Sequence, residues 1–375
     1  MGKGHVIKNA SGLVFPFGRP RILDLTITDA DLAKTAGGFF DGRYIYTCPV
    51  TPASKIGRID TRDFSSVSVL DLAITDATLT NMNPLGTDGK YGYFTYAGNG
   101  GANAGKVARV DLEDFSTVTV LDMALTDSSY KGYHGGFIVG KYAYLAPYNS
   151  GSPHGKVARI DLDDFSTVTA LDLTSSDSDL KGFEGGCTDG KYGYFSPAYN
   201  GARFGKVPKI DLATFTYVGQ VNLANISTTL ESYEGGILTD GNYLYLIPHY
   251  NDGYFGKFVR ISLSDFTEHG VTVLDTTTVN SNLKGYMGGF IAGRYLYAIQ
   301  QRVTTASPPS GISAYWTRID LDNFTTSGVE WRDFSVYDSE LKGNGFGLFD
   351  GTYAYILSNW YGKVARFLAM YSGER

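Results

Sequence analysis

Seven copies of the pattern Gly-x-Tyr-x-Tyr occur in this chain at intervals of about 50 residues, and this repetition restricts the possible folds more than any other feature. The copies begin at Gly42, Gly89, Gly140, Gly190, Gly241, Gly293 and Gly351. Each copy lies in the same frame of four short runs that are rich in β-branched and aromatic residues and bounded by Gly, Asp or Ser, which is typical of strands. Five copies follow an Asp, and Asp-Gly favours a tight hairpin turn. The chain is therefore expected to contain seven units of four strands.

Seven such units predict an all-β fold, a seven-bladed β-propeller with four-stranded antiparallel blades. The two ends of the repeat array support this prediction. Residues 362–370 have the pattern of a third strand without a fourth, and residues 20–25 have the pattern of an isolated fourth strand. Pairing the two would remove two exposed sheet edges. We therefore expect the strand at about 21–25 to complete the last blade and close the ring.

The repeat frame also predicts the domain organisation. Residues 1–19 are expected to be an N-terminal extension, and residues 20–375 a single propeller. The blades are expected at about 36–72, 82–123, 133–173, 183–223, 233–275, 286–334 and 344–369, the last together with 21–25.

Propeller geometry assigns the loops to two faces. We name the strands of each blade A to D, with strand A lining the central channel. The A–B and C–D turns then share one face, and they are short and nearly invariant. The B–C and D–A loops share the other face, and they vary in length and content. Because function commonly resides on variable loops of a rigid scaffold, we expect the site on the D–A/B–C face.

Two recurring features of the repeats have a structural explanation. In every D–A loop an Asp, Asn or Ser stands three residues before an apolar residue, which is typical of a capped helical turn. A calcium loop would need more converging carboxylates. These positions are Asp29, Asp76, Asp127, Asp177, Ser227, Asn280 and Asp338. An Arg in most C strands recurs too regularly to mark a site, and we expect it to lie between blades or to pair with an Asp.

The position just before Gly-Gly in strand A, at the channel mouth, varies with the repeat. From repeat one to seven it holds Ala36, Asn83, His134, Glu184, Glu234, Met287 and Gly345. The chemically capable residues are therefore adjacent, in repeats three to five. The B–C loops of the same repeats add Tyr148, Asn149, His154, Tyr199, Asn200, Arg203, His249, Tyr250 and Asn251. We expect these residues to form a substrate-binding site.

Lysines in the D–A loops give this face a second feature. Lys131 and Lys181 stand in equivalent positions of repeats three and four. They are either ordinary solvated lysines or part of a cationic rim that would attract an anionic ligand.

Composition excludes several classes of function. The formal net charge is -6 without a basic stripe, so a nucleic-acid partner is not expected. Apolar runs are too short for membrane insertion, and the first residues lack the apolar core of a signal peptide, so localisation stays open. Cys48 and Cys187 provide neither a disulfide framework nor a thiolate zinc site. His134, His154 and His249 with Glu184 are acceptable zinc ligands, but their spacing is not compact; no cofactor is expected, and the sequence does not exclude a zinc or calcium ion.

The segments "YHGG", "SPHGK" and "YNGARFGK" give the chain a resemblance to seven-bladed propeller polysaccharide lyases of the ulvan-lyase type. The resemblance implies β-elimination on an acidic polysaccharide at the D–A/B–C face. His134 and Tyr199 would be base and acid, and His154 and Arg203 would hold the sugar carboxylate, which must be neutralised for its neighbouring proton to become acidic. The alternative is a non-catalytic propeller, either a carbohydrate-binding adhesin or a structural component of a cell surface or virus particle. A glycan-acting protein of either kind would be expected outside the cell or on a particle surface.

Overall fold

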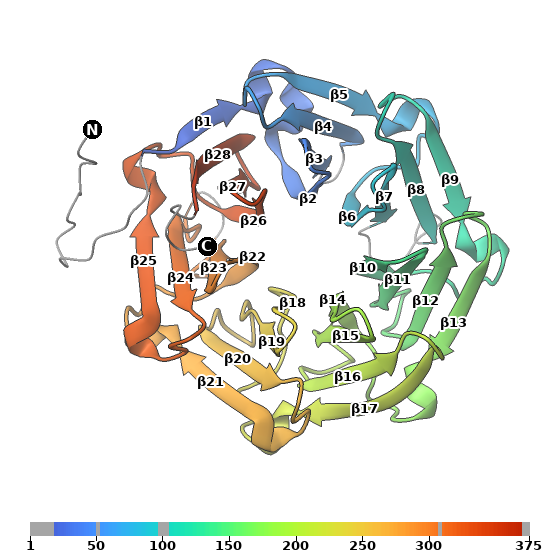
Figure 1. Cartoon of the computed structure of the whole chain (residues 1–375), viewed down its shortest axis with the longest axis vertical. Coiled ribbons are helices and arrows are strands. Elements are labelled where there is room, and N and C mark those ends of the chain that lie inside the picture. The colour runs from blue at the N-terminus through green and yellow to red at the C-terminus, as the bar shows by residue number, and fades with distance from the viewer. Residues whose placement is uncertain (1–18, 50–52, 97–104, 307–309, 370–375) are drawn as a thin grey trace.

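Seven four-stranded antiparallel sheets surround a central channel in the computed structural model, which describes residues 19–49, 53–96, 105–306 and 310–369 (Figure 1). The predicted seven-bladed β-propeller is thereby confirmed. The expected extension at 1–19 lies outside the described residues except for Arg19. No helix in the described ranges is long and apolar enough to cross a membrane.

The strands of each blade follow one another from the channel outward. Blades one to three comprise β2 (Thr35–Phe40), β3 (Tyr44–Pro49), β4 (Lys55–Asp60) and β5 (Val67–Asp71); β6 (Met82–Thr87), β7 (Tyr91–Tyr96), β8 (Lys106–Asp111) and β9 (Val118–Asp122); and β10 (Tyr133–Val139), β11 (Tyr142–Pro147), β12 (Lys156–Asp161) and β13 (Val168–Asp172). Blades four and five comprise β14 (Phe183–Thr188), β15 (Tyr192–Pro197), β16 (Lys206–Asp211) and β17 (Thr216–Asn222); and β18 (Ile237–Thr239), β19 (Tyr243–Leu246), β20 (Lys257–Ser262) and β21 (Val271–Asp275). Blades six and seven comprise β22 (Tyr286–Ala292), β23 (Tyr295–Gln300), β24 (Tyr315–Asp320) and β25 (Val329–Asp333); and β26 (Asn344–Phe349), β27 (Tyr353–Ser358), β28 (Lys363–Leu368) and β1 (Arg21–Asp24).

Short 3-10 helices connect the strands on the rim. They are η1 (Leu25–Ile27), η2 (Ala30–Ala33), η3 (Leu72–Ile74), η4 (Met123–Leu125), η5 (Leu173–Ser175), η6 (Leu223–Asn225), η7 (Glu268–Gly270), η8 (Thr276–Thr278), η9 (Thr326–Gly328) and η10 (Phe334–Val336).

The ring closes as expected, because β1 pairs antiparallel with β28. Asp24 stands opposite Lys363, and the Lys363 Nζ lies 2.7 Å from the Asp24 Oδ2. The strand ends at Asp24 because the same carboxylate caps η1 by accepting a hydrogen bond from the Thr26 N–H. The last blade therefore joins chain segments from both ends of the repeat array.

The repeated Tyr anchors each hairpin that carries an Asp. In blade two the Asp88 Oδ1 accepts hydrogen bonds from two backbone N–H groups of the A–B turn, and the Asp88 Oδ2 accepts one from the Tyr93 hydroxyl at 2.6 Å. Gly89 has φ +96°, which confirms the predicted Asp-Gly turn. Blade three has Val139 in place of the Asp, and there the Tyr144 hydroxyl donates to the Leu212 carbonyl of the next blade.

The D–A loops form the predicted capped turns. In the turn before blade two, the Asp76 Oδ1 accepts a hydrogen bond from the Thr78 N–H, and the Leu79 N–H donates to the Asp76 carbonyl. The Lys106 Nζ lies 2.7 Å from the Asp76 Oδ2. The other turns have the same backbone bond, so these carboxylates and hydroxyls belong to the scaffold. Within the described ranges, no three His, Cys, Asp or Glu side chains are grouped so that they could hold a metal ion.

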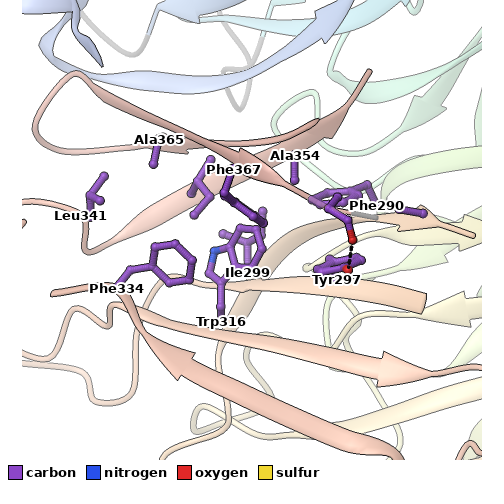
Figure 2. Close-up of a cluster of buried hydrophobic side chains, with 12 residues drawn as sticks. Phe290, Tyr297, Ile299, Trp316, Phe334, Leu341, Ala354, Ala365 and Phe367 are labelled. Atoms are coloured by element: carbon purple, nitrogen blue, oxygen red, sulfur yellow. Dashed lines mark hydrogen bonds between the residues drawn. The ribbon is translucent and has the colours of Figure 1, made fainter. Parts of the chain in front are cut away.

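The hydrophobic core lies between neighbouring blades. Figure 2 shows the contact of blades six and seven, where Trp316 and Phe334 pack against Phe367. At other seams the repeated Arg of strand C lies between two rings. The Arg109 Cζ is 4.6 Å from the Tyr91 ring centroid in its own blade and 4.4 Å from the Phe165 centroid in the next blade. The expected between-blade role of this Arg is confirmed.

Candidate functional site

A cavity of about 290 Å³ occupies the channel, and the A strands line it. The predicted position before Gly-Gly contributes to its wall through Asn83, His134, Glu184, Glu234, Met287 and Gly345. The glycines that follow His134, Glu184, Glu234 and Met287 add no side chain to the channel, whereas Pro84 and Phe346 line it in blades two and seven. Most of the cavity wall is therefore apolar or neutral, and its ionisable side chains lie where blades three to five meet.

His134 and Glu184 form the first half of this ionisable sector. Both come from the first strands of neighbouring blades, β10 and β14. The His134 Nδ1 lies 3.5 Å from the Glu184 Oε1, and the His134 ring centroid is 5.5 Å from that of Tyr148. Both side chains are largely buried, with 24% and 14% of their surfaces exposed.

Arg203, Glu234 and His249 form the second half. Arg203 lies in the B–C loop of blade four, and its Nη1 donates to the Glu234 Oε1 at 2.5 Å. The His249 Nδ1 lies 3.3 Å from the other carboxylate oxygen, Oε2. Two tyrosines flank the guanidinium, with ring centroids 5.7 Å (Tyr199) and 5.1 Å (Tyr250) from the Arg203 Cζ. The site thus has an ion pair whose carboxylate lines the cavity and whose guanidinium lies beside two aromatic rings.

The two glutamates differ in charge although they occupy the same repeat position. Burial, and then the negative charge of Glu234, raise the pKa of Glu184 to about 8. Burial acts on Glu234 as well, but the hydrogen bonds and positive charges of His249 and Arg203 outweigh it and lower the pKa of Glu234. At neutral pH Glu184 is therefore a carboxylic acid that can donate a hydrogen bond, and Glu234 is a carboxylate that accepts.

Burial also sets the state of two neighbouring rings. It lowers the pKa of His134 to about 4, so this imidazole is neutral at pH 7 and a weak base. Burial, then the charges of Glu184 and Glu234, raise the pKa of Tyr148 to about 12, so its hydroxyl stays protonated. The sector therefore contains hydrogen-bond donors and acceptors with little net charge.

The structure brings together most of the predicted residues. His134, Tyr148, Glu184, Arg203, Glu234, His249 and Tyr250 belong to this sector, with Tyr199 at its edge and 40% exposed. The resemblance to lyases pairs His134 with Tyr199, but the ring that packs against His134 is that of Tyr148.

Other predicted residues hold the loops. The His154 Nε2 is 3.1 Å from the Gly132 carbonyl, and its ring packs edge-on against the buried Tyr133. Asn149 and Asn200 accept hydrogen bonds from backbone N–H groups two residues further on, and Asn251 donates to the Thr229 carbonyl. Lys131 and Lys181 follow the capped D–A turns, and their role as a cationic rim stays a prediction.

Sequence reasoning missed Ser232. Its Oγ accepts a hydrogen bond from the Arg203 Nη1 at 2.8 Å and lies 3.2 Å from the Glu234 Oε1, to which it donates. The repeats gave a signal: the Lys-Gly dipeptide that precedes strand A in blades three, four, six and seven is Glu231-Ser232 in blade five. This departure falls in the same sector as the others.

Comparisons with known proteins support the fold assignment and provide no information on function. No family model and no curated protein matches the sequence. Hydrazine synthase from Kuenenia stuttgartiensis is similar in structure, with a TM-score of 0.59, 15% identity, and coverage of 90% of this chain and 96% of that chain. BamB from Moraxella catarrhalis has a TM-score of 0.50, 12% identity, and coverage of 89% and 83%. Neither structure is described as a lyase, so the resemblance to polysaccharide lyases gains no support from them. The chain is a seven-bladed β-propeller that resembles hydrazine synthase and BamB in fold.

Proposed function

We propose that this propeller binds carbohydrate at the channel mouth, over blades three to five. The observation that carries the proposal is the convergence of Glu184, Glu234, Arg203 and His249 at one side of the cavity. Sugar hydroxyls both donate and accept hydrogen bonds, and this sector offers a protonated carboxyl, a carboxylate, a guanidinium and imidazoles. The cavity volume of about 290 Å³ is near the lower end for small-molecule sites, which favours one sugar unit of a larger glycan.

The faces of Tyr199 and Tyr250 support the same ligand class. Both rings flank Arg203, which is paired with the cavity-lining Glu234, and Tyr199 is substantially exposed. An aromatic face with a polar edge packs well against the C–H groups of a sugar ring. A second sugar unit would therefore lie on these rings while the first enters the cavity.

The charge distribution favours a particular orientation of an acidic glycan. Arg203 is already paired with Glu234, so it has little attraction left for a ligand carboxylate. The protonated Glu184 can donate a hydrogen bond to that carboxylate, and Lys131 and Lys181 would add positive charge from the D–A loops. We therefore propose that an acidic sugar places its carboxylate toward blades three and four.

Cleavage by β-elimination is the second candidate. It is favoured by neighbouring carboxyl groups whose pKa values are shifted in opposite directions, a common arrangement for acid–base pairs. In such a reaction Tyr148 and Glu184 would be the proton donors nearest the cavity. His134 is disfavoured as the base, because an imidazole with a pKa of about 4 removes protons poorly.

Binding of neutral and acidic oligosaccharides, measured by calorimetry or on a glycan array, tests the proposal. We expect Arg203→Ala and Glu234→Gln each to weaken binding by about tenfold or more, because each leaves a buried polar partner unsatisfied. Lys131→Ala with Lys181→Ala should weaken only acidic glycans and reduce the salt dependence, whereas Lys284→Ala in blade six is the matched control.

Two results would contradict the proposal. One is the absence of binding to any oligosaccharide class, and the other is a bound sugar on the A–B/C–D face. Ultraviolet absorbance of unsaturated products during incubation with acidic polysaccharides separates the two candidates, since binding alone releases none.

A further inference from the structure

Ser232 has a backbone conformation that the other blades give mainly to glycine. Its φ is +60°, and the side chain is fully buried. The equivalent residues in blades three, four, six and seven are Gly132, Gly182, Gly285 and Gly343, with φ between +62° and +80°. A serine in this region is strained, and strain of this kind persists only when its surroundings impose it.

The glycines are required because the B–C loop of the same blade passes over them. A Cβ on Gly182 would lie 1.8 Å from the Tyr199 carbonyl oxygen, and one on Gly285 would lie 1.9 Å from that of Arg302. In blade four the Gly182 carbonyl accepts hydrogen bonds from the Ala198 and Tyr199 N–H groups. A serine at this position is therefore incompatible with the usual path of the loop.

Blade five accordingly starts differently from its neighbours. The pairing of β18 with β19 begins only at Ile237, opposite Leu246, whereas β14 pairs with β15 from Phe183, opposite Pro197. The segment before β18 has no ladder pairing in its own sheet and is bonded to blade four, through a contact that blade six also makes, where the Tyr286 N–H donates to the Pro248 carbonyl. The Tyr233 N–H donates to the Pro197 carbonyl at 2.7 Å, and the Ser196 hydroxyl donates to the Tyr233 carbonyl at 2.6 Å. Glu234 thereby lies in a turn that the neighbouring blade holds.

The Ser232 hydroxyl completes this arrangement. It accepts from Arg203 and donates to Glu234, so a single side chain is bonded to both members of the ion pair. Arg203 also has Asp252 nearby, with 3.8 Å between its Nε and the Asp252 Oδ1. Since Arg203 belongs to blade four and Glu234 to blade five, the hydroxyl fixes the pair across the seam.

We infer that Ser232 is a positioning residue of the sugar site: it displaces the first residues of blade five and fixes Glu234 as a hydrogen-bond acceptor for sugar hydroxyls. The inference rests on the proposed function for its ligand. A carboxylate held rigidly beside His249 accepts from hydroxyl groups and repels a ligand carboxylate. Blade five is thus assigned to the hydroxyl groups of the sugar, and Glu184 of blade four to its carboxylate.

Two substitutions separate positioning from a purely structural role. Ser232→Gly removes the strain and the hydroxyl, so the melting temperature should stay equal or rise while glycan affinity falls about tenfold. Ser232→Ala keeps the Cβ and loses only the hydroxyl, so both the melting temperature and the affinity should fall. Asn81→Gly, at the equivalent position of blade two with φ +53°, is the matched control and should leave affinity unchanged.

A measurement without ligand keeps the inference independent of the proposed function. Carboxyl ¹³C NMR of the free protein reports the titration of Glu234, which faces Arg203, His249 and Glu184 and is also within the field of His134 and Tyr148. Loss of the Ser232 hydrogen bond should raise the pKa of Glu234 in Ser232→Gly. A raised pKa in a protein that binds no glycan would support the positioning role and refute the proposed function. An unchanged pKa, or a destabilised Ser232→Gly with unchanged affinity, would overturn the inference.

Discussion

Glu184 and Glu234 show how the surroundings of a residue decide its chemistry. Both follow an aromatic residue and precede Gly-Gly, and both face the same cavity. Glu184 lies 3.5 Å from the imidazole of His134, which is neutral, whereas Glu234 has hydrogen bonds to Arg203 and His249. One side chain type in two adjacent blades therefore supplies a proton donor and an acceptor.

This difference predicts an unusual dependence of stability on pH. The pKa of Glu184 in the folded protein is about 8, above its ordinary value of 4.5. The contribution of this group to the free energy of unfolding is therefore fully present below pH 4.5 and is lost as the pH rises to 8. Glu184→Gln removes this titration. At pH 8 its melting temperature should exceed that of the unmodified protein by about 2 °C or more, and the difference should disappear near pH 4.5.

His134 provides the control because its shift has the opposite sign. Its folded pKa of about 4 lies below the ordinary 6.5, so its contribution to stability is present above pH 6.5 and is lost as pH falls toward 4. His134→Gln should therefore differ from the unmodified protein most at acidic pH. If the melting temperatures of Glu184→Gln and of the unmodified protein depended on pH in the same way, Glu184 would not be protonated at neutral pH.

At the scale of elements, the seams between blades depend on aromatic rings carried by the C–D turns. Phe165 has φ +49°, a conformation that is uncommon for a large side chain. The turn holds it there because the ring packs on Arg109 and lies 5.8 Å from the Tyr93 ring of the preceding blade. The same φ recurs at Phe64 and Phe115, so the repeated Asp-Phe pair of the sequence provides a contact between blades.

Removal of this ring should destabilise the seam between blades two and three. Phe165 is 5% exposed, and Phe165→Ala leaves a cavity and an Arg109 without its second ring, so we expect a loss of about 3 kcal/mol in the free energy of unfolding. Urea denaturation provides the measurement. Lys131→Ala, on the other face, is the control, and a change below about 1 kcal/mol for Phe165→Ala would show that the turn does not stabilise the seam.

At the scale of the whole molecule, stability depends on a ring without open edges. β1 is the outermost strand of blade seven, although it precedes blade one in the chain (Figure 1). Its four residues pair with β28, and Asp24 of β1 forms an ion pair with Lys363 of β28. Blade seven would otherwise end at β28, with an unpaired edge.

Deletion of residues 1–25 should therefore lower the melting temperature and promote association. Deletion of residues 1–18, which keeps β1, is the matched control, so the difference between the two proteins measures the contribution of the strand. Differential scanning calorimetry and size-exclusion chromatography follow the two effects. Equal melting temperatures and elution volumes for both deletions would contradict closure of the ring by β1.

The sequence by itself determined the seven-bladed fold, its closing strand, the capped D–A turns and the sector of blades three to five. These follow from local patterns: strand runs, Asp-Gly turns and capping residues act within a few positions, and a repeat makes departures such as His134 and Glu234 visible. The role of Ser232 was visible only as an unexplained departure. Its meaning depends on hydrogen bonds with Arg203 and the Phe204 carbonyl of another blade.

Only the tertiary structure decided which of the sector residues meet and in which charge state. Tyr199 occupies the loop position of Asn149, one residue beyond that of Tyr148, so Tyr148 packs on His134 and Tyr199 lies beside Arg203. His154 contacts the Gly132 carbonyl, a contact that spacing does not reveal. Glu184 and Glu234 acquire opposite pKa shifts because burial and nearby charges, unlike residue type, are set by side chains brought together from different blades.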